Sequence, residues 1–391
     1  MSNNNKTPAI RFKGFTDTWE QRKLGDIASD MVAGGDIDKD LILAEGQYPV
    51  IANALTGDGI VGYYDKEYRV NAPAVTVTGR GDVGHAKARL VNFTPVVRLL
   101  SVKSEHDVFF LENVINTLKI VIESTGVPQL TVPQLAKYEV AFPRQLDEEE
   151  HIGAFFKQLD QLITLHQRKC DKLIQFKAAM LKKMFPQNGA DKPEIRFKGF
   201  TDAWEQRELR TAATFSKGSG YSKNDLKENG TPIILYGRLY TKYETVISEV
   251  DTFVDVQPNS VYSTGHEVIV PASGEMAEDI SRASFVAKSG ILLGGDLNII
   301  VPDDYINPVF LALTISNGNQ QKELSKRAQG KSVVHIHNSD LENVVLLYPK
   351  YEEQEKIGEY FSKLDSLITI HQRKCDKYKS IKSGLIRKLF P

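Results

Sequence analysis

Two stretches of the sequence occur twice, and this duplication strongly limits how the chain can fold. Residues 10–24 (IRFKGFTDTWEQRKL) return as 195–209 (IRFKGFTDAWEQREL), identical at 13 of 15 positions. Residues 159–172 (LDQLITLHQRKCDK) return as 364–377 (LDSLITIHQRKCDK), identical at 12 of 14 positions. The long segments between the copies are similar in size but largely unrelated in sequence. A duplicated frame with two divergent inserts predicts one scaffold that recognises two different things.

The composition is that of a globular protein with two or more domains. The chain has 391 residues, of which 41% are hydrophobic and 25% charged. Its first residues do not form a secretory signal, and no apolar run approaches the roughly 18 residues that span a bilayer. The two cysteines, Cys170 and Cys375, fit a reducing compartment. We therefore expect a cytoplasmic protein that does not contact a membrane.

The charge balance gives no general attraction to nucleic acid. The net charge is −1, and both inserts are acidic: residues 25–147 hold 11 basic and 16 acidic side chains, and residues 210–351 hold 13 and 16. Any contact with DNA must therefore come from local basic patches.

The second repeated stretch lies within a predicted long helix. In residues 152–184 and again in 357–389, mainly apolar residues recur at steps of three and four, without an internal proline. They form a stripe along one side of the helix, the seam, that would face a partner helix. Asp147, with Glu150 three residues later, is predicted to cap the first helix. At 1.5 Å per residue each helix would be roughly 50 Å long. Two such helices bury their seams most economically as an intramolecular antiparallel coiled coil.

The inserts have the mixed pattern of α/β domains. Strands are predicted at 74–79, 94–102, 259–265 and 291–303, and helices at 109–124 and 307–328. The predicted architecture is a pseudo-twofold repeat of two mixed α/β domains joined by two long helices. Its predicted boundaries are 1–147 and 187–351 for the domains, and 148–186 and 352–391 for the helices.

Residues 79–84 (GRGDVG) match a dinucleotide-binding pattern, G-x-G-x-x-G, after a strand-like run. A dinucleotide site needs a helix next, but the following residues are strand-like, so we predict a β-hairpin turn. The hairpin is basic, and we select Arg80, Lys87 and Arg89 as contacts to DNA phosphates or a groove. A solvated basic edge strand is the alternative.

Candidate DNA contacts in the second insert are chosen for chemistry and loop position. They are Tyr236, Arg238, Tyr240 and Lys242 in LYGRLYTK, and Lys331 and Ser332 after Gly330. Gly330 does not open a phosphate loop, because Ser325 stands where the earlier glycine is required. Asn307-Pro308 is better explained as a helix start than as a methyltransferase motif. Neither pattern supports catalysis.

Two further patterns have a structural and a functional interpretation. The pairs His166/Cys170 and His371/Cys375 have i, i+4 spacing and would offer four zinc ligands if they met, but seam packing explains them without metal. We therefore expect no metal site. The aromatic residues of the repeated openings either pack each opening onto its own domain, which we favour, or contact a partner protein. They include Phe15, Trp19, Phe200 and Trp204.

The repeated motifs FKGF-x-D-x-WE-Q-R-x-L and LD-x-LIT-x-HQRK, in their alternating order, closely resemble specificity subunits of type I restriction–modification enzymes over essentially the whole chain. The resemblance implies two target-recognition domains held apart by an antiparallel helix pair. Each domain would read one half of an asymmetric, bipartite site on double-stranded DNA. The repeated regions would dock two methyltransferase (modification) subunits and, through the complex, restriction subunits that act as motor and nuclease.

The same resemblance implies a chain without catalysis or cofactor, since S-adenosylmethionine, ATP and Mg²⁺ would belong to the partner subunits. Three alternatives remain open. The chain could serve another restriction class, with a fused methyltransferase–nuclease as partner. A self-contained DNA methyltransferase would bind S-adenosylmethionine alone, and a coiled-coil scaffold would bind no DNA even with partners present.

Overall fold

The protein consists of two compact units. The computed structural model describes residues 7–121, 128–187, 189–330 and 333–391. Unit 1 contains Met1–Gln167 together with Arg373–Pro391, and unit 2 contains Arg168–Gln372. Each unit therefore has a globular domain and a part of both long helices. Within the described ranges, every helix is too short or too polar to cross a membrane.

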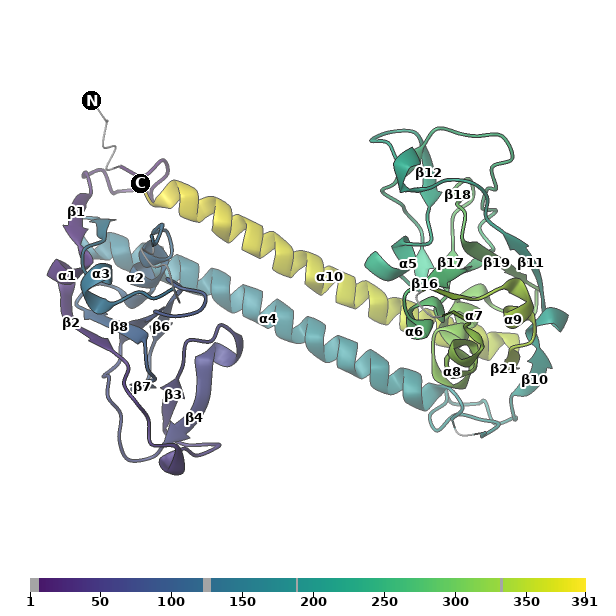
Figure 1. Ribbon diagram of the computed structural model, residues 1–391, viewed down its shortest axis with the longest axis horizontal. Coiled ribbons are helices and arrows are strands. Elements are labelled where there is room, and N and C mark those ends of the chain that lie inside the picture. Colours follow the sequence, from purple (N-terminus) through teal and green to yellow (C-terminus); the bar gives the residue numbers. More distant parts are fainter. Residues whose placement is uncertain (1–6, 122–127, 188, 331–332) are drawn as a thin grey trace. The chain divides into compact units, whose positions relative to one another are not determined.

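The two predicted long helices are confirmed, at 39 residues each (Figure 1). They are α4 (Leu146–Met184) and α10 (Tyr351–Leu389). The predicted cap of the first helix is wrong, because α4 already begins at Leu146 and Asp147 lies inside its first turn. There its carboxylate is close to the positive end of the helix dipole, a favourable place for negative charge.

The helices pack against each other in antiparallel orientation within each unit. In unit 1, Lys382 of α10 binds the carboxylate of Asp160 at 2.7 Å, and the Cys375 thiol donates to Gln167 Oε1 at 3.5 Å. Residue numbers therefore decrease along α4 as they increase along α10, which is the mark of an antiparallel pair. Unit 2 has the same contacts with the helices exchanged: Lys177 binds Asp365, and Cys170 donates to Gln372 Oε1 at 3.6 Å.

Unit 1 has a four-stranded sheet in the order β2-β8-β5-β6, a three-stranded sheet in the order β4-β3-β7, and the pair β1-β9. The strands are β1 (Glu20–Lys23), β2 (Ala28–Ala33), β3 (Tyr48–Ile51), β4 (Ile60–Tyr64), β5 (Ala74–Thr78), β6 (Ala86–Arg89), β7 (Thr94–Pro95), β8 (Leu99–Ser104) and β9 (Glu139–Phe142). The short helices are α1 (Leu24–Ile27), η1 (Lys39–Leu41), η2 (Thr56–Gly59), α2 (Val108–Ile115) and α3 (Val132–Leu135).

Unit 2 has sheets in the orders β11-β19-β15-β17-β13 and β14-β12-β18, and the pairs β10-β21 and β16-β20. The strands are β10 (Glu205–Glu208), β11 (Ala213–Lys217), β12 (Thr231–Ile234), β13 (Val246–Ile247), β14 (Phe253–Val254), β15 (Val268–Pro271), β16 (Ser273–Gly274), β17 (Ser284–Val286), β18 (Leu292–Leu293), β19 (Leu297–Pro302), β20 (Val334–His335) and β21 (Val345–Tyr348). The shorter helices are η3 (Leu209–Thr211), η4 (Lys223–Asp225), α5 (Arg238–Thr241), α6 (Ala277–Ile280), α7 (Pro308–Ile315), α8 (Gly318–Arg327) and α9 (Asn338–Glu342).

The two units share one topology although their inserts differ in sequence. The order β2-β8-β5-β6 of unit 1 returns as β11-β19-β15-β17 in unit 2. In both small sheets, the first partner is antiparallel (β3 with β4, β12 with β14) and the second is parallel (β3 with β7, β12 with β18). The mixed α/β class and the shared plan of the inserts are therefore confirmed.

Each core is closed by a phenylalanine that follows a long helix. In unit 1, Phe390 lies 5.5 Å from Phe110 and 5.9 Å from Phe156 between ring centroids. In unit 2, Phe185 lies 5.7 Å from Phe310 and 6.1 Å from Phe361. All are buried, and full burial of one such side chain contributes about 1.5–3 kcal/mol to folding.

Several predicted elements are shorter than the sequence suggested. The helix predicted at 109–124 ends at Ile115, and residues 122–124 lie outside the described residues. The helix predicted at 307–328 is divided into α7 and α8, since Gly318 has a φ of +68°. The strand predicted at 259–265 amounts to a single bridge between Tyr262 and Leu292.

Candidate nucleic-acid interface

The loop between β5 and β6 is the turn of an antiparallel hairpin, as predicted for residues 79–84. Gly81 and Gly84 have φ values of +75° and +94°, which favour glycine. The Thr78 hydroxyl donates to the carbonyl of Asp82 and accepts from the backbone of His85, so the turn is closed internally. Arg80 is exposed at the start of this turn, where its guanidinium is available to a phosphate.

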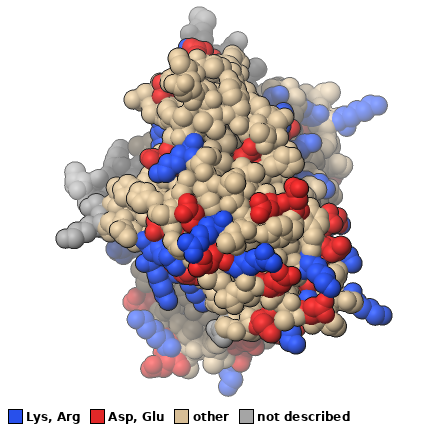
Figure 2. Space-filling view, turned by 90° about the vertical axis from the view of Figure 1, so that its right-hand side faces the viewer, with Lys and Arg blue, Asp and Glu red and all other residues tan. Residues whose placement is uncertain are grey.

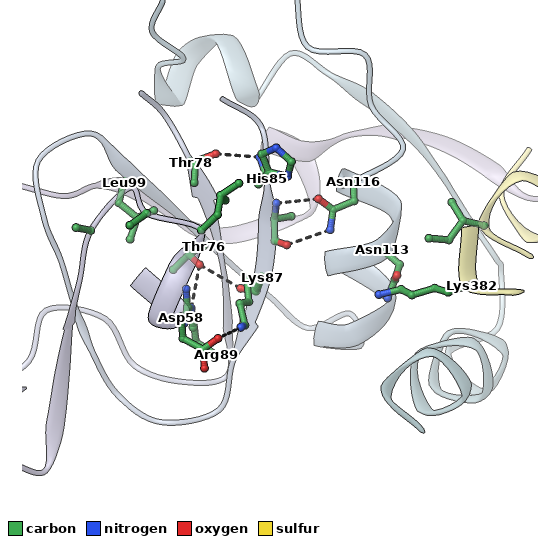
Figure 3. Close-up of a pocket in the computed structure, with 15 residues that line it drawn as sticks. Asp58, Thr76, Thr78, His85, Lys87, Arg89, Leu99, Asn113, Asn116 and Lys382 are labelled. Carbon is green, nitrogen blue, oxygen red and sulfur yellow. Dashed lines mark hydrogen bonds and ion pairs between the residues drawn. The ribbon is translucent and has the colours of Figure 1, made fainter. Parts of the chain in front are cut away.

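Lys87 and Arg89, on β6, line a cavity of about 420 Å³ in unit 1 (Figure 3). Lys87 forms an ion pair with Asp58. Arg89 Nε donates to Thr76 Oγ1 at 3.0 Å, and burial lowers the pKa of its guanidinium. An arginine stays charged in proteins, so Lys87 and Arg89 both bring a positive charge to this cavity, and Asp58 brings a negative one.

The cavity also reaches α2 and α10. Asn116, the residue directly after α2, exchanges two hydrogen bonds with the backbone of Ala86, at 2.9 and 3.0 Å, and so fixes the end of the helix against β6 (Figure 3). Lys382 of α10 lines the same cavity. Next to it, burial raises the pKa of Glu112, and the charge of Lys382 partly opposes this rise.

Unit 2 has a larger cavity of about 930 Å³, which brings together Tyr236, Arg238 and Lys242. The Arg238 guanidinium is buried and donates to Asp251 and Glu244, each at 2.7 Å. Lys242 also binds Asp251 at 2.7 Å. Hydrogen bonds from Lys242 and Arg238 lower the pKa of Asp251 to about 2.

The remaining candidates of the second insert are not in this group. The Tyr240 hydroxyl donates to the carbonyl of Ser273, and burial raises its pKa. Lys331 and Ser332 lie outside the described residues. Sequence reasoning missed Tyr221 and Asp296, which line the cavity with φ values of +55° and +57°. Aspartate adopts such a backbone conformation more often than most residues, so Asp296 after Gly294-Gly295 carries a weak sequence signal, whereas Tyr221 carries none.

The repeated openings are held to the long helices by ion pairs between a partly buried arginine and a buried glutamate. Arg11 donates to both carboxylate oxygens of Glu148 on α4, at 2.8 and 2.6 Å. Arg196 makes the same two bonds to Glu353 on α10, at 2.9 and 2.6 Å. Both glutamates are buried, and a bidentate arginine–carboxylate pair fixes orientation as well as distance.

The aromatic residues of the openings divide into two kinds. Trp19 and Trp204 are only 1% and 4% exposed and pack on Phe110 and Phe310, which favours the packing interpretation for them. Phe15 and Phe200 are partly exposed. The Lys356 ammonium lies 4.8 Å from the centre of the Phe200 ring. Contact between these phenylalanines and a partner protein remains a prediction.

The surface of unit 2 carries charge of both signs. Figure 2 shows lysine and arginine side chains interspersed with aspartate and glutamate, and an area of mainly uncharged side chains above them. This agrees with the near-neutral composition. The thiols of Cys170 and Cys375 take part in the hydrogen bonds between the long helices, and no group of three or more metal-ligating side chains occurs within the described parts of the chain.

Comparison with known proteins gives matches in both halves. A family model for the type I restriction modification DNA specificity domain matches residues 16–175 and 201–377. Two Mycoplasma pneumoniae proteins named as type I specificity subunits are 31% identical over 137 residues and 27% identical over 160 residues. These matches cover 34% and 40% of this chain, and 37% and 47% of the two relatives. The matched part is thus less than half the length of either relative.

A solved structure extends the likeness to the whole chain. The S subunit of a type I restriction–modification system from M. genitalium aligns with 98% of this chain and 99% of its own, with a TM-score of 0.72 and 15% identity. At this identity the likeness shows the fold: two α/β domains and two long helices that pack together.

Proposed function

The chain belongs to the family of type I restriction–modification DNA specificity domains, and on that premise we propose that it directs a DNA methyltransferase to one bipartite target. The observation that carries the proposal is the repeated topology. One fold occurs twice with the same helix contacts, but with different side chains at its cavities. Two recognition domains whose cavities carry different side chains would bind two different half-sites, and so suit an asymmetric target on double-stranded DNA.

In unit 1 we assign the reading surface to the β5–β6 hairpin. Arg80 is exposed at the turn, and Lys87 and Arg89 lie at one cavity on β6. Guanidinium and ammonium groups bind phosphates and the acceptor atoms of guanine in the major groove. Asn116, directly after α2, bonds to the backbone of Ala86 and so holds the strand that carries Lys87 and Arg89.

In unit 2 the reading surface would be built around Tyr236 and Lys242, at the larger cavity. Arg238 would not contact DNA itself, because its guanidinium already binds Asp251 and Glu244. It would orient Asp251 and, through it, Lys242. Lys331 and Ser332 remain proposed contacts on chemical grounds alone.

We assign partner docking to the repeated frame. Apolar side chains remain exposed on the helices, such as Leu165 in unit 1 and Ile174 and Phe176 in unit 2. Phe15 and Phe200 are partly exposed beside the starts of α4 and α10. Two methyltransferase subunits would use such surfaces, and restriction subunits would join through the complex. S-adenosylmethionine, ATP and Mg²⁺ would be bound by these partners.

The long helices would act as the spacer between the half-sites. Half-sites one turn of DNA apart are separated by roughly 34 Å, which helices of this length can span. Because the inserts are acidic, the chain alone should bind DNA weakly and with strong dependence on salt, and tightly only within the complex. Equal affinity of the lone chain and the complex for the target would contradict this division of labour.

The deciding experiment is co-expression with the cognate methyltransferase, followed by single-molecule mapping of methyladenine. We expect one asymmetric motif in two parts. Arg89→Met should weaken or relax only one half of the motif, whereas Arg144→Met, which removes an exposed arginine paired with Glu20, should leave both halves unchanged. Methylation without a motif, or a palindromic motif, would count against the proposal.

A further inference from the structure

The cavity of unit 1 is lined by more cationic than anionic side chains. Besides Arg89, it is lined by Lys87, which pairs with the lining residue Asp58, and by Lys382, whose ammonium also binds Asp160. Its volume of about 420 Å³ falls within the range of roughly 300–1,000 Å³ typical of small-ligand pockets. The cavity is therefore large enough for more than a phosphate group.

Asn113 of α2 gives the cavity a buried acceptor. Its side chain is 1% exposed and lines the cavity, and its Nδ2 donates to the carbonyl of Phe109 at 2.8 Å. Its Oδ1 is buried and has no hydrogen-bond partner among the described residues. A buried acceptor without a donor is unfavourable, so this oxygen calls for a ligand N–H or O–H.

Unit 2 lacks this arrangement at the equivalent place. Helices α2 and α7 both have eight residues, and each starts at a side chain that accepts from the same two backbone amides. Asn113 therefore corresponds to Leu313, and Asn116 corresponds to Ser316, which bonds to the backbone of Ala283 as Asn116 bonds to Ala86. The Tyr243 hydroxyl is within hydrogen-bond distance of the Ser316 hydroxyl and of the Ala283 carbonyl, at 3.2 Å from each. Where unit 1 has an open polar cavity, unit 2 has leucine and tyrosine.

We propose that this cavity of unit 1 binds one nucleotide whose base carries an exocyclic amino group. The phosphate would lie against Lys87 and Arg89, and the amino group would donate to Asn113 Oδ1. If the proposed function holds, the nucleotide is one that is unstacked from the DNA target, as proteins do when they read a single base in a pocket. A free mononucleotide has the same chemistry and is the other source.

The test uses the full chain, titrated calorimetrically with deoxyadenosine monophosphate and with the purine analogue that lacks the amino group. We expect one site and about five- to tenfold weaker binding of the analogue, the effect of one hydrogen bond. Asn113→Leu, which copies unit 2, should remove this difference. Asn317→Leu is the matched control, because Asn317 makes the same bond to the carbonyl four residues earlier, in unit 2.

Arg89→Met serves as a second variant if Asn113→Leu folds poorly. It should weaken the binding of both nucleotides by the same factor. Binding of inorganic phosphate as tight as that of the nucleotide, equal binding of both purines, or no nucleotide binding at millimolar concentration would each overturn the inference. Displacement of the nucleotide by target duplex in the methyltransferase complex identifies DNA as the source, and lack of displacement identifies the free nucleotide. Motif-specific methylation is a separate readout. If the wild-type complex showed none, that result would refute the proposed function but not the nucleotide site.

Discussion

At the scale of residues, several charged groups of the repeated openings and of the candidate sites form ion pairs with one another. Arg11, whose side chain is 10% exposed, pairs with the buried Glu148, and the hydrogen bonds that it donates to this carboxylate raise the pKa of the Arg11 guanidinium. Such a pair fixes geometry more than it adds stability, because each ion loses its hydration. Removing one partner is far more damaging than removing both, since the remaining charge stays buried.

Glu148→Gln should therefore destabilise unit 1, by about 1–3 kcal/mol, since it leaves the partly buried Arg11 guanidinium without its bidentate counter-charge. Glu150→Gln is the control, because Glu150 is exposed two residues later on the same helix. Urea unfolding followed by tryptophan fluorescence measures both. Equal midpoints for the two variants would show that the pair is not a structural anchor.

The low pKa of Asp251 predicts a dependence on pH. A carboxyl whose pKa falls from its ordinary value near 4 to about 2 on folding contributes stability above about pH 4, and this contribution is lost as the pH falls towards 2. An NMR titration of the carboxyl groups should give Asp251 a pKa of about 2. In Lys242→Met the value should rise towards the ordinary one, whereas Lys227→Met, which removes a lysine paired with Asp255, should not move it.

At the scale of elements, the long helices could be predicted from the sequence and the short ones could not. A seam repeated over 30 residues has few alternatives to a helix, and the duplication supports it twice. In contrast, α2 stops at Ile115, and the Asn116 side chain bonds to β6, a contact between distant parts of the chain. The grouping of Lys87 with Arg89 followed from their strand, but the engagement of Arg238 by Asp251 depended on tertiary structure.

Glycines inside the long helices report how tightly each helix is packed. A Cβ on Gly153 would lie 1.9 Å from Asp107 Oδ1, the atom that caps α2, whereas a Cβ on Gly384 would meet nothing within 4 Å. Gly153 is thus the site where α4 admits the start of α2. Gly358, its counterpart on α10, has neighbours at 3.3–3.4 Å and is less restricted.

Gly153→Ala should destabilise unit 1 by at least the 1 kcal/mol or so of a lost helix cap. Gly384→Ala should instead stabilise its helix by about 0.5–1 kcal/mol, because alanine favours the helical backbone. Thermal unfolding of the two variants beside the wild type gives both signs. A gain in stability for Gly153→Ala would mean that the cap of α2 moves away without loss.

At the scale of the whole molecule, one fold is used twice with different walls around its cavities. The contacts between the helices join Asp160 to Lys382 and Asp365 to Lys177. The two aspartates belong to the repeated stretches and the two lysines stand at equivalent positions beyond them, so these contacts do not depend on which insert is present. Recognition and spacing are therefore separable in the proposed function.

Seven residues inserted into both helices, after Gln167 and after Gln372, test this separation. They add about 10 Å of helix at an unchanged seam, or about three base pairs of DNA. Methyladenine mapping should find the same half-sites with a longer spacer. Altered letters in either half-site would show that the helices take part in reading.

The closure of unit 1 by Phe390 also decides the order in which the domains mature on the ribosome. The phenylalanine packs on Trp19 and Phe110, which are synthesised more than 250 residues earlier. Unit 2 is one continuous stretch and can complete its core first. The amino-terminal domain must therefore wait, with an incomplete apolar core, until translation has passed the carboxy-terminal one. A premature stop near residue 385 would harm the domain made first.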